Sequence, residues 1–131
     1  GGSSVTLTNV PVPVISPLGV VTNGIAGNEY TITRGNNVWA KEDKAGTNAT
    51  TGASPSGGAT LNFDFPYGGT GVLPSTYTSA ASTNLFYMNN IMHDVWYQYG
   101  FNEASGSFQT KNYNNLPGGN DHVLADAPMV I

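Results

Sequence analysis

The stretch of sequence that decides the fold is residues 79–100, SAASTNLFYMNNIMHDVWYQYG. Its apolar side chains recur every three or four residues, which is the period of one face of an α-helix. The stripe comprises Leu85, Met88, Ile91, Met92, Val95, Trp96 and Tyr99. Neither Gly nor Pro interrupts it, Ser79 and Ser82 are candidate N-caps, and Gly100 suits the left-handed residue that ends many helices. The pattern predicts one principal helix over residues 79–99 whose apolar stripe lies in the core.

Short strands are expected on both sides of this helix. Residues 5–10 and 30–33 alternate apolar with polar side chains, residues 61–65 do so most clearly, and residues 122–125 form a short apolar run. Residues 41–60 open with a charged run and continue with small polar residues, which indicates a flexible loop. The sequence therefore predicts an α+β fold, a twisted sheet of short strands with one principal helix.

The composition excludes several classes of protein. The 131 residues allow one domain or half-domain, 1–131. Only 9% of them are charged, against about 25% in average proteins, and the net charge is −4. Without a basic surface, neither nucleic acid nor an anionic membrane is an expected partner. The absence of cysteine excludes disulfides and thiol nucleophiles. The start GGSS has no initiator Met and no signal pattern, which indicates a mature or excised segment.

Few side chains suit chemistry. The candidates for metal binding are His93, Asp94, Asp121, His122 and Asp126. His93 and Asp94 are adjacent and therefore point about 100° apart on a helix, which is unsuitable spacing for one metal ion. The favoured interpretation is that His93 is partly buried and hydrogen-bonded to backbone or to a carboxylate, with Asp94 as a surface or capping partner. No nucleophile elbow and no phosphate-binding loop is present in the sequence.

An ordered run of short motifs carries a family resemblance. Residues 84–109 contain NLFY at the start, His93 and Asp94 in the middle, YGFNE at the expected helix end, and then GSFQ. GGND follows at residues 118–121 and VLA at 123–125, and YTITRGNNV precedes the helix at 30–38. Over about residues 28–127 the chain resembles the fungalysins, secreted zinc metalloendopeptidases of fungi and bacteria that are distantly similar to thermolysin.

The resemblance implies a secreted, extracellular enzyme that hydrolyses peptide bonds in proteins with zinc as cofactor; calcium is a candidate second ion. The family takes its zinc ligands from a HExxH helix and a later Glu, and this chain has no HExxH. The zinc ligands are therefore expected beyond residue 131, in a C-terminal half that would be the partner of this chain. In thermolysin-like enzymes an N-terminal lobe binds extended peptide at an edge strand. This chain would be that lobe, inactive alone.

Site residues follow from the same resemblance. Matched by position, Gly118, Gly119, Asn120 and Asp121 are the implied substrate-binding residues. The glycines would let a substrate backbone approach closely, and the Asn120 side chain could hold the substrate's main chain. His93, Asp94 and Glu103 belong to the family pattern in an architectural role.

Two non-enzymatic alternatives stay open. A non-catalytic extracellular structural or assembly protein could retain part of the peptidase scaffold and pair through an uncovered edge strand. A carbohydrate-binding module would need Trp96 and Tyr97 exposed, whereas the peptidase interpretation buries at least Trp96 against neighbouring strands. If the catalytic half is missing, part of the helix face becomes exposed and self-association is expected.

Overall fold

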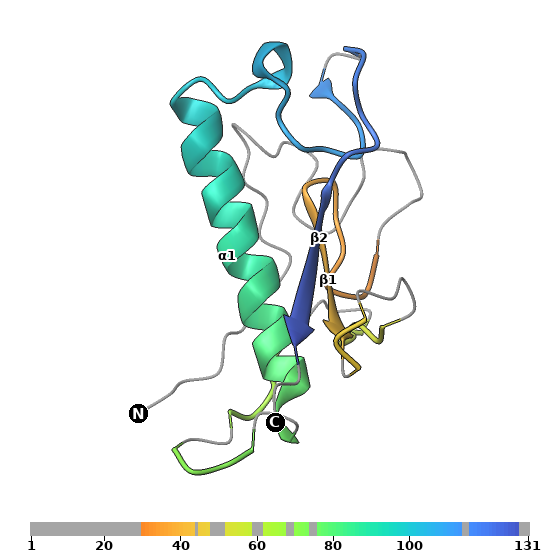
Figure 1. Ribbon diagram of the computed structural model, residues 1–131, viewed down its shortest axis with the longest axis vertical. Coiled ribbons are helices and arrows are strands. Elements are labelled where there is room, and N and C mark those ends of the chain that lie inside the picture. The colour runs from red at the N-terminus through yellow and green to blue at the C-terminus, as the bar shows by residue number, and fades with distance from the viewer. Residues whose placement is uncertain are drawn as a thin grey trace.

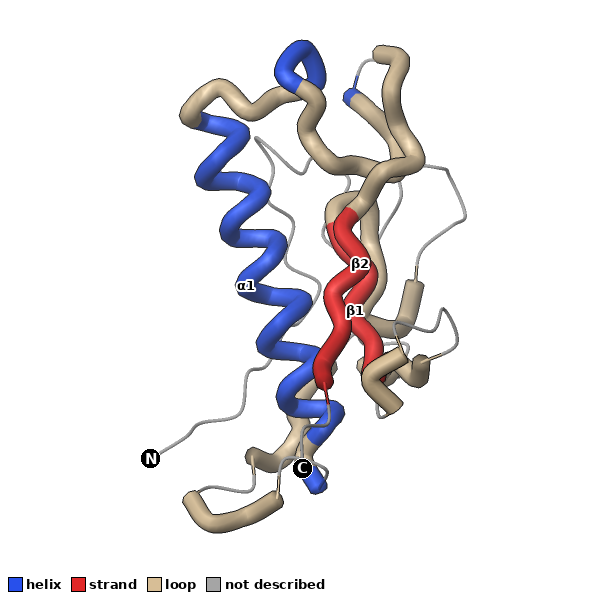
Figure 2. The backbone as a smooth tube through the Cα atoms, in the orientation of Figure 1, coloured by secondary structure: helices blue, strands red, loops and turns tan. Residues whose placement is uncertain are grey.

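The computed structural model combines one long helix with a small sheet. It describes residues 30–43, 45–47, 52–58, 62–67, 70–73, 76–113 and 116–128. Strand β1 is Val38–Asp43, helix α1 is Thr78–Gln98, the 3₁₀ turn η2 is Glu103–Ser105, and strand β2 is Val123–Pro128. Figure 1 shows α1 running alongside the two strands, and Figure 2 shows loops over most of the other described residues. The predicted α+β class with one principal helix is confirmed.

The two strands pair in parallel, with Val38 opposite Val123 and Asp43 opposite Pro128. The outer side of β1 is occupied, because the Ala40 amide donates to the Thr33 carbonyl and the Glu42 amide to that of Ala53. β2 is the edge strand among the described residues.

The outer edge of β2 has no partner strand among the described residues. The Val123 amide donates to the Asn37 carbonyl, so by alternation the amides of Leu124 and Asp126 point away from β1. No described residue hydrogen-bonds these two outward amides. Pro128 stands at the next outward position, where its missing N–H removes nothing from the pairing.

Small side chains let α1 pack closely on the sheet. The core contains Val38 and Ala40 of β1, Ala125 of β2, Phe86 of α1 and Phe63 from a connecting segment. Phe86 is fully buried and Phe63 is 1% exposed. The two rings therefore fill most of the space that the alanines leave open.

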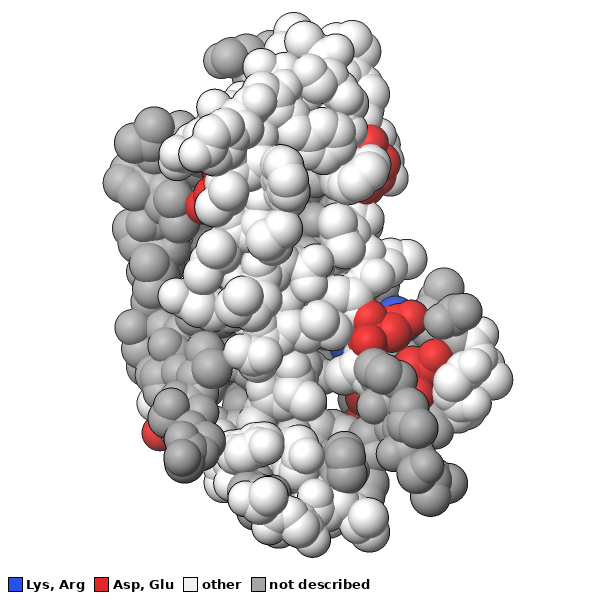
Figure 3. Space-filling model, turned by 60° about the vertical axis from the view of Figure 1, so that its left-hand side comes forward, with Lys and Arg blue, Asp and Glu red and all other residues white. Residues whose placement is uncertain are grey.

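The prediction that the apolar stripe of the helix lies in the core is wrong for all of its residues except Leu85, which is partly buried against the core. The buried residues of α1 are Ser82, Thr83, Phe86 and Asn90, and all but Phe86 are polar. The apolar side chains point outward: Tyr87, Met88, Ile91, Met92, Val95, Trp96 and Tyr99 are each at least 36% exposed. We call these seven residues the outward apolar face. Figure 3, which brings the helix side forward, shows this part of the surface almost free of charged atoms. Periodicity locates an apolar stripe but does not say what covers it.

The predicted helix bounds are accurate, but the predicted N-caps are wrong. The N-cap is Tyr77, with no side-chain cap hydrogen bond. Ser79 lies inside the helix, and Ser82 is buried against the sheet. At the other end Gly100 has φ of +106°, as a left-handed terminating residue requires.

Only one of the predicted strands is confirmed among the described residues. Residues 122–125 are confirmed in β2, which begins one residue later and extends to Pro128. The strand over 61–65 is wrong in its described part, since residues 62–65 have no regular structure although Phe63 is buried. Within 30–33 only Ile32 forms a bridge, to Ser56. The strand over 5–10 lies outside the described residues. The alternating pattern over 61–65 thus identified the buried residue Phe63, but it did not show that the segment pairs with another strand.

The predicted loop over 41–60 starts later than expected. Lys41, Glu42 and Asp43 complete β1, and Lys41 is only 1% exposed. Its ammonium forms an ion pair with Asp126, directly opposite on β2. That pairing lets a charged run enter a sheet. The flexibility of the rest of this loop stays a prediction. No helix in the described part of the chain is long and apolar enough to span a membrane.

Candidate functional site

A polar network joins the C-terminal half of α1 to the segment that follows it. Its centre is the carboxylate of Glu103 on η2, which accepts hydrogen bonds from the Tyr97 hydroxyl (2.7 Å) and the Gln109 side-chain amide (3.2 Å). It also accepts one from the backbone amide of Tyr113 (3.2 Å). One carboxylate therefore fixes the helix, the turn and the following segment relative to one another.

Gln109 is the buried hub of this network, with no exposed surface. Its side-chain amide donates both to Glu103 and to Asn112 Oδ1 (3.1 Å), and its Oε1 lies 3.0 Å from His93 Nε2. Its backbone amide donates to Asp121 Oδ1 (3.0 Å), and its carbonyl accepts from the Asp121 amide (3.2 Å). Gln109 thus connects the helix to residues 118–121.

Both ring nitrogens of His93 face oxygen atoms. Nδ1 lies 3.0 Å from Asp94 Oδ1, and the side chain of His93 is 8% exposed. The interpretation of His93 as a partly buried residue bonded to a carboxylate is confirmed, and Asp94 is its partner. Because both nitrogens face acceptors, a doubly protonated ring satisfies this geometry fully.

Residues 118–121 are held by the rest of the chain. The Asn120 amide donates to the Thr110 carbonyl (2.7 Å), and Asn120 itself has a left-handed φ of +68°. A Cβ added at Gly119 would lie 2.6 Å from the same carbonyl oxygen of Thr110. Gly119 is therefore explained by close packing against the chain itself, an explanation that does not involve a substrate backbone. The side chains of Asn120 and Asp121 are exposed.

Burial and hydrogen bonding shift two pKa values in the network. Burial, together with the hydrogen bond to Glu103, raises the pKa of Tyr97 to about 12. Burial alone would raise the pKa of Glu103, but hydrogen bonds from Tyr97, its own backbone, Gln109 and the Tyr113 amide lower it below its ordinary value. At neutral pH the network therefore contains a carboxylate and a neutral phenol.

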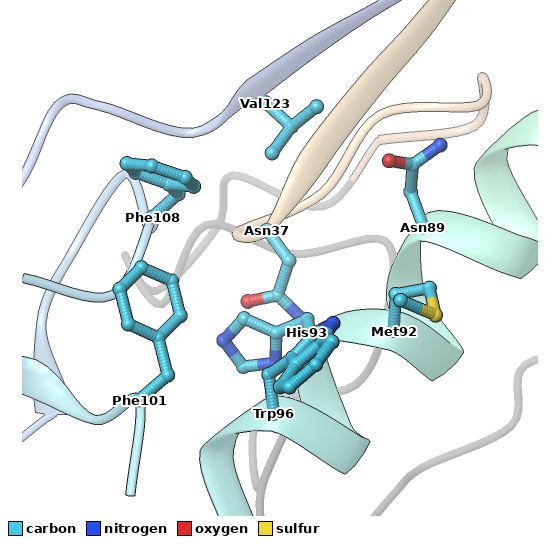
Figure 4. A pocket seen from close by; sticks show the side chains of 8 residues that line it. All are labelled: Asn37, Asn89, Met92, His93, Trp96, Phe101, Phe108 and Val123. Atoms are coloured by element: carbon cyan, nitrogen blue, oxygen red, sulfur yellow. The ribbon is translucent and has the colours of Figure 1, made fainter.

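A mostly apolar cleft of about 300 Å³ opens beside the network, between α1 and the start of β2. Figure 4 shows Met92, His93 and Trp96 projecting from the helix, with Phe101 and Phe108 across the cleft. Asn37, Asn89 and Val123 complete its lining. The cleft continues the outward apolar face to the sheet, since Met92 and Trp96 belong to both.

The candidate metal ligands do not come together. In the described part of the chain no three His, Asp or Glu side chains gather to hold a metal ion. Asp126 pairs with Lys41. Within the described segments neither ring nitrogen of His122 has a hydrogen-bond partner. Burial together with the charge of Arg34 lowers the pKa of His122, against the opposite effect of Asp121. The described residues therefore do not form a zinc site.

The exposure of Trp96 and Tyr97 distinguishes the peptidase interpretation from the carbohydrate-binding module. Trp96 is 53% exposed, which contradicts its expected burial against neighbouring strands. Tyr97 is half-buried, with its hydroxyl bonded to Glu103. A sugar-binding platform using both rings is therefore not present.

The structure brings together four of the residues singled out from the sequence. His93, Asp94 and Glu103 meet through Gln109, and the same residue reaches Asp121. The sequence reasoning missed Gln109 as the hub. A buried glutamine leaves no periodic signal, and its presence within the GSFQ motif was the only available indication.

Comparison with known proteins shows a family match and several similar relatives. The family model described as fungalysin metallopeptidase (M36) matches residues 1–129. Extracellular metalloproteinase 1 of Trichophyton rubrum is 40% identical over 112 residues, which are 86% of this chain and 17% of that protein. The protein of the same name from Arthroderma otae is 38% identical with the same coverage. Extracellular metalloproteinase 5 of Arthroderma otae is 39% identical over 100 residues, 76% of this chain and 16% of that protein.

This chain therefore spans only about 17% of the length of these relatives. The resemblance expected from the motifs at residues 30–38, 84–109 and 118–125 is confirmed. The chain belongs to the fungalysin (M36) family of metallopeptidases.

Proposed function

We propose that the chain is the N-terminal portion of a secreted, zinc-dependent metalloendopeptidase that hydrolyses peptide bonds in extracellular proteins. In this proposal the chain contributes the substrate-binding edge strand and loop, and the zinc ligands lie in the remainder of the protein. The family membership and the names of the extracellular metalloproteinases support it. The missing HExxH agrees with this division of roles.

The observation that carries the proposal is the open outer edge of β2. The outward amides of Leu124 and Asp126 have no hydrogen-bond partner among the described residues. An extended peptide can add to such an edge through its main chain, which gives affinity without demanding a particular sequence. Residues 118–121 lead directly into this strand, so Asn120 and Asp121 would lie at one end of a bound peptide.

The outward apolar face supports a larger protein around this portion. A contiguous apolar surface of this kind is unusual on a monomer and is typical of an interface. The C-terminal half would cover this face and bring the zinc site toward the substrate. A zinc ion held by that half would supply the activation of water for attack on a peptide carbonyl, and this chain would bind and orient the substrate.

The test uses the protein that contains this chain together with its continuation. Leu124→Pro removes one outward N–H of β2 without removing a bond to β1, and Leu124→Ala is the matched control that retains the N–H. We expect Leu124→Pro to lower kcat/KM for a peptide substrate at least tenfold while zinc content and secondary structure stay unchanged. Equal activities of the two variants would contradict a substrate-binding edge.

A second candidate is a non-catalytic extracellular assembly protein, favoured by the same open edge and by the outward apolar face. It predicts no chelator-sensitive peptidase activity and a mass in solution that grows with concentration. Sedimentation velocity combined with a peptidase assay, with and without chelator, separates the two candidates.

A further inference from the structure

We infer that His93, acting through Gln109, is a positioning residue for the loop 118–121 and holds it in place only when its ring is doubly protonated. The inference rests on the proposed function for the claim that this loop meets substrate. The claim that His93 holds the loop rests on hydrogen bonds alone.

The argument starts from the orientation of the Gln109 amide. Its NH₂ group faces two acceptors, Glu103 Oε1 at 3.2 Å and Asn112 Oδ1 at 3.1 Å. Turning the amide over would place its oxygen against the Glu103 carboxylate and lose both bonds. Gln109 Oε1 must therefore face His93, where it can only accept.

His93 then needs two protons. Its Nε2 must donate to Gln109 Oε1, and its Nδ1 faces the carboxylate of Asp94 at 3.0 Å. A neutral ring carries one N–H, and the carboxylate is the stronger acceptor, so that proton stays on Nδ1. Deprotonation consequently removes the bond to Gln109 and leaves two lone pairs facing each other in a buried place.

Gln109 passes this change to the loop through its backbone. The Gln109 amide and carbonyl both bond to Asp121, and the next carbonyl, that of Thr110, accepts from the Asn120 amide. With its side chain released from His93, Gln109 keeps its side-chain bonds to Glu103 on η2 and to Asn112. The loop then loses its direct tie to α1 and keeps the indirect one through Glu103 and Tyr97.

The other ionisable groups around His93 do not replace it in this role. Asp94 and Tyr97 lie on α1, with the Tyr97 ring 5.8 Å from that of His93. Glu103 approaches from η2 through Gln109, and Tyr113 packs behind Tyr97. Among side chains, histidine is the one that ordinarily changes charge between about pH 5 and 8. The loop is therefore expected to be held at the lower end of this range and looser at the upper end.

The direct test is amide hydrogen exchange of the whole protein between pH 5.5 and 8.5, with rates corrected for the pH dependence of exchange itself. We expect protection of the Asn120 and Asp121 amides to fall about tenfold as pH rises, as the loss of one hydrogen bond to a charged group implies. The β1 amides of Ala40 and Glu42 serve as internal references and should not change. Unchanged protection at residues 120 and 121 across this range would overturn the inference.

The chain offers a matched pair of variants, because its second histidine, His122, adjoins the loop. His93→Gln should abolish the pH dependence of protection, and His122→Gln should leave it in place; the reverse result would overturn the inference. Asp94→Asn is the second variant, in case His93→Gln fails to fold. It should move the midpoint of the change to lower pH, because it removes the anion that favours the doubly protonated ring. An unmoved midpoint would count against the inference.

Activity separates this inference from the proposed function. If the loop binds substrate, KM should rise with pH in step with the loss of protection while kcat follows its own profile, and His93→Gln should show a raised KM at every pH. A pH-dependent loop with an unaffected KM would contradict the substrate-binding role and still support the positioning role of His93.

Discussion

The side of α1 that faces the sheet and the side that faces away differ in both chemistry and burial. Toward the sheet, Thr83 bonds to the Ser79 carbonyl, and Asn90 bonds to the Phe86 carbonyl and to Asn37. Away from it, Trp96 is 53% and Tyr99 is 84% exposed. The comparison teaches that polar residues can form a helix-to-sheet contact when most of their hydrogen bonds are made to the helix's own carbonyls, with Asn90 also reaching Asn37. The buried Ser82 hydroxyl is the exception, with no hydrogen-bond partner among the described residues. The apolar face is then available for a second contact.

The largest effect should come from Phe86, the fully buried apolar residue on the inward side of α1. Phe86→Ala is expected to lower the free energy of unfolding by about 3–5 kcal/mol, because it leaves a cavity where the ring packs against the alanines. Phe108→Ala, at a position 48% exposed, is the matched control and should cost much less. Denaturant unfolding measures both; equal losses would contradict the assignment of Phe86 to the core.

A smaller loss should follow from Glu103→Gln, which keeps the shape of the side chain and removes its charge. The variant turns a threefold acceptor into a group with its own NH₂, so we expect a loss of about 1–3 kcal/mol. Asp64→Asn, at an exposed carboxylate, should stay within about 0.5 kcal/mol. Thermal unfolding measures both variants. Equal stability of Glu103→Gln and Asp64→Asn would contradict a stabilising role of the network.

The outward side is tested by Met92→Gln in the protein that contains this chain and its continuation. If the C-terminal half covers the outward apolar face, burying a polar amide there should cost about 1–2 kcal/mol. Gln98→Ala, at an exposed position near the end of the same helix, is the control and should be nearly neutral. A neutral Met92→Gln with unchanged oligomeric state would indicate that this face stays open to solvent.

The smallest expected effect is the pH dependence of the stability that the Glu103 network contributes. Because the pKa of Glu103 is lower in the folded protein than its ordinary value of 4.5, its contribution is present above that value. It is lost as pH falls through the folded-state pKa. The difference in unfolding free energy between the wild type and Glu103→Gln should therefore shrink below about pH 4.5. A difference that is constant from pH 7 to pH 3 would contradict an ionised Glu103.

Local features of the fold were predictable because they rest on local physics. Helix α1 has an uninterrupted period and a terminating glycine, Gly100, and both act within a few residues of chain. The run before Ala125 similarly identified β2. The predicted strand is absent from residues 62–65 because an alternating pattern indicates burial on one side, here of Phe63. It does not show that a neighbouring strand is available for pairing.

The sequence identified several residues of the candidate site but not the contacts between them. The motifs drew attention to His93, Asp94, Glu103 and Asp121, but adjacency in the sequence gave no reason to join them. Gln109 connects them across the space between α1, η2 and the loop 118–121, and its neighbours are up to 16 residues away in sequence. Such contacts depend on where the chain returns, which no local pattern encodes.

The sequence by itself determined the helix and its bounds, the low charge and the lack of cysteine, the absence of HExxH and, through ordered motifs, the family. Only the tertiary structure decided which side of α1 meets the sheet, that Lys41 enters β1 beside Asp126, and that Gln109 links His93 to the loop. The physical reason is that periodicity and composition are properties of neighbouring residues. Burial and hydrogen-bond partners are instead set by segments far apart in sequence.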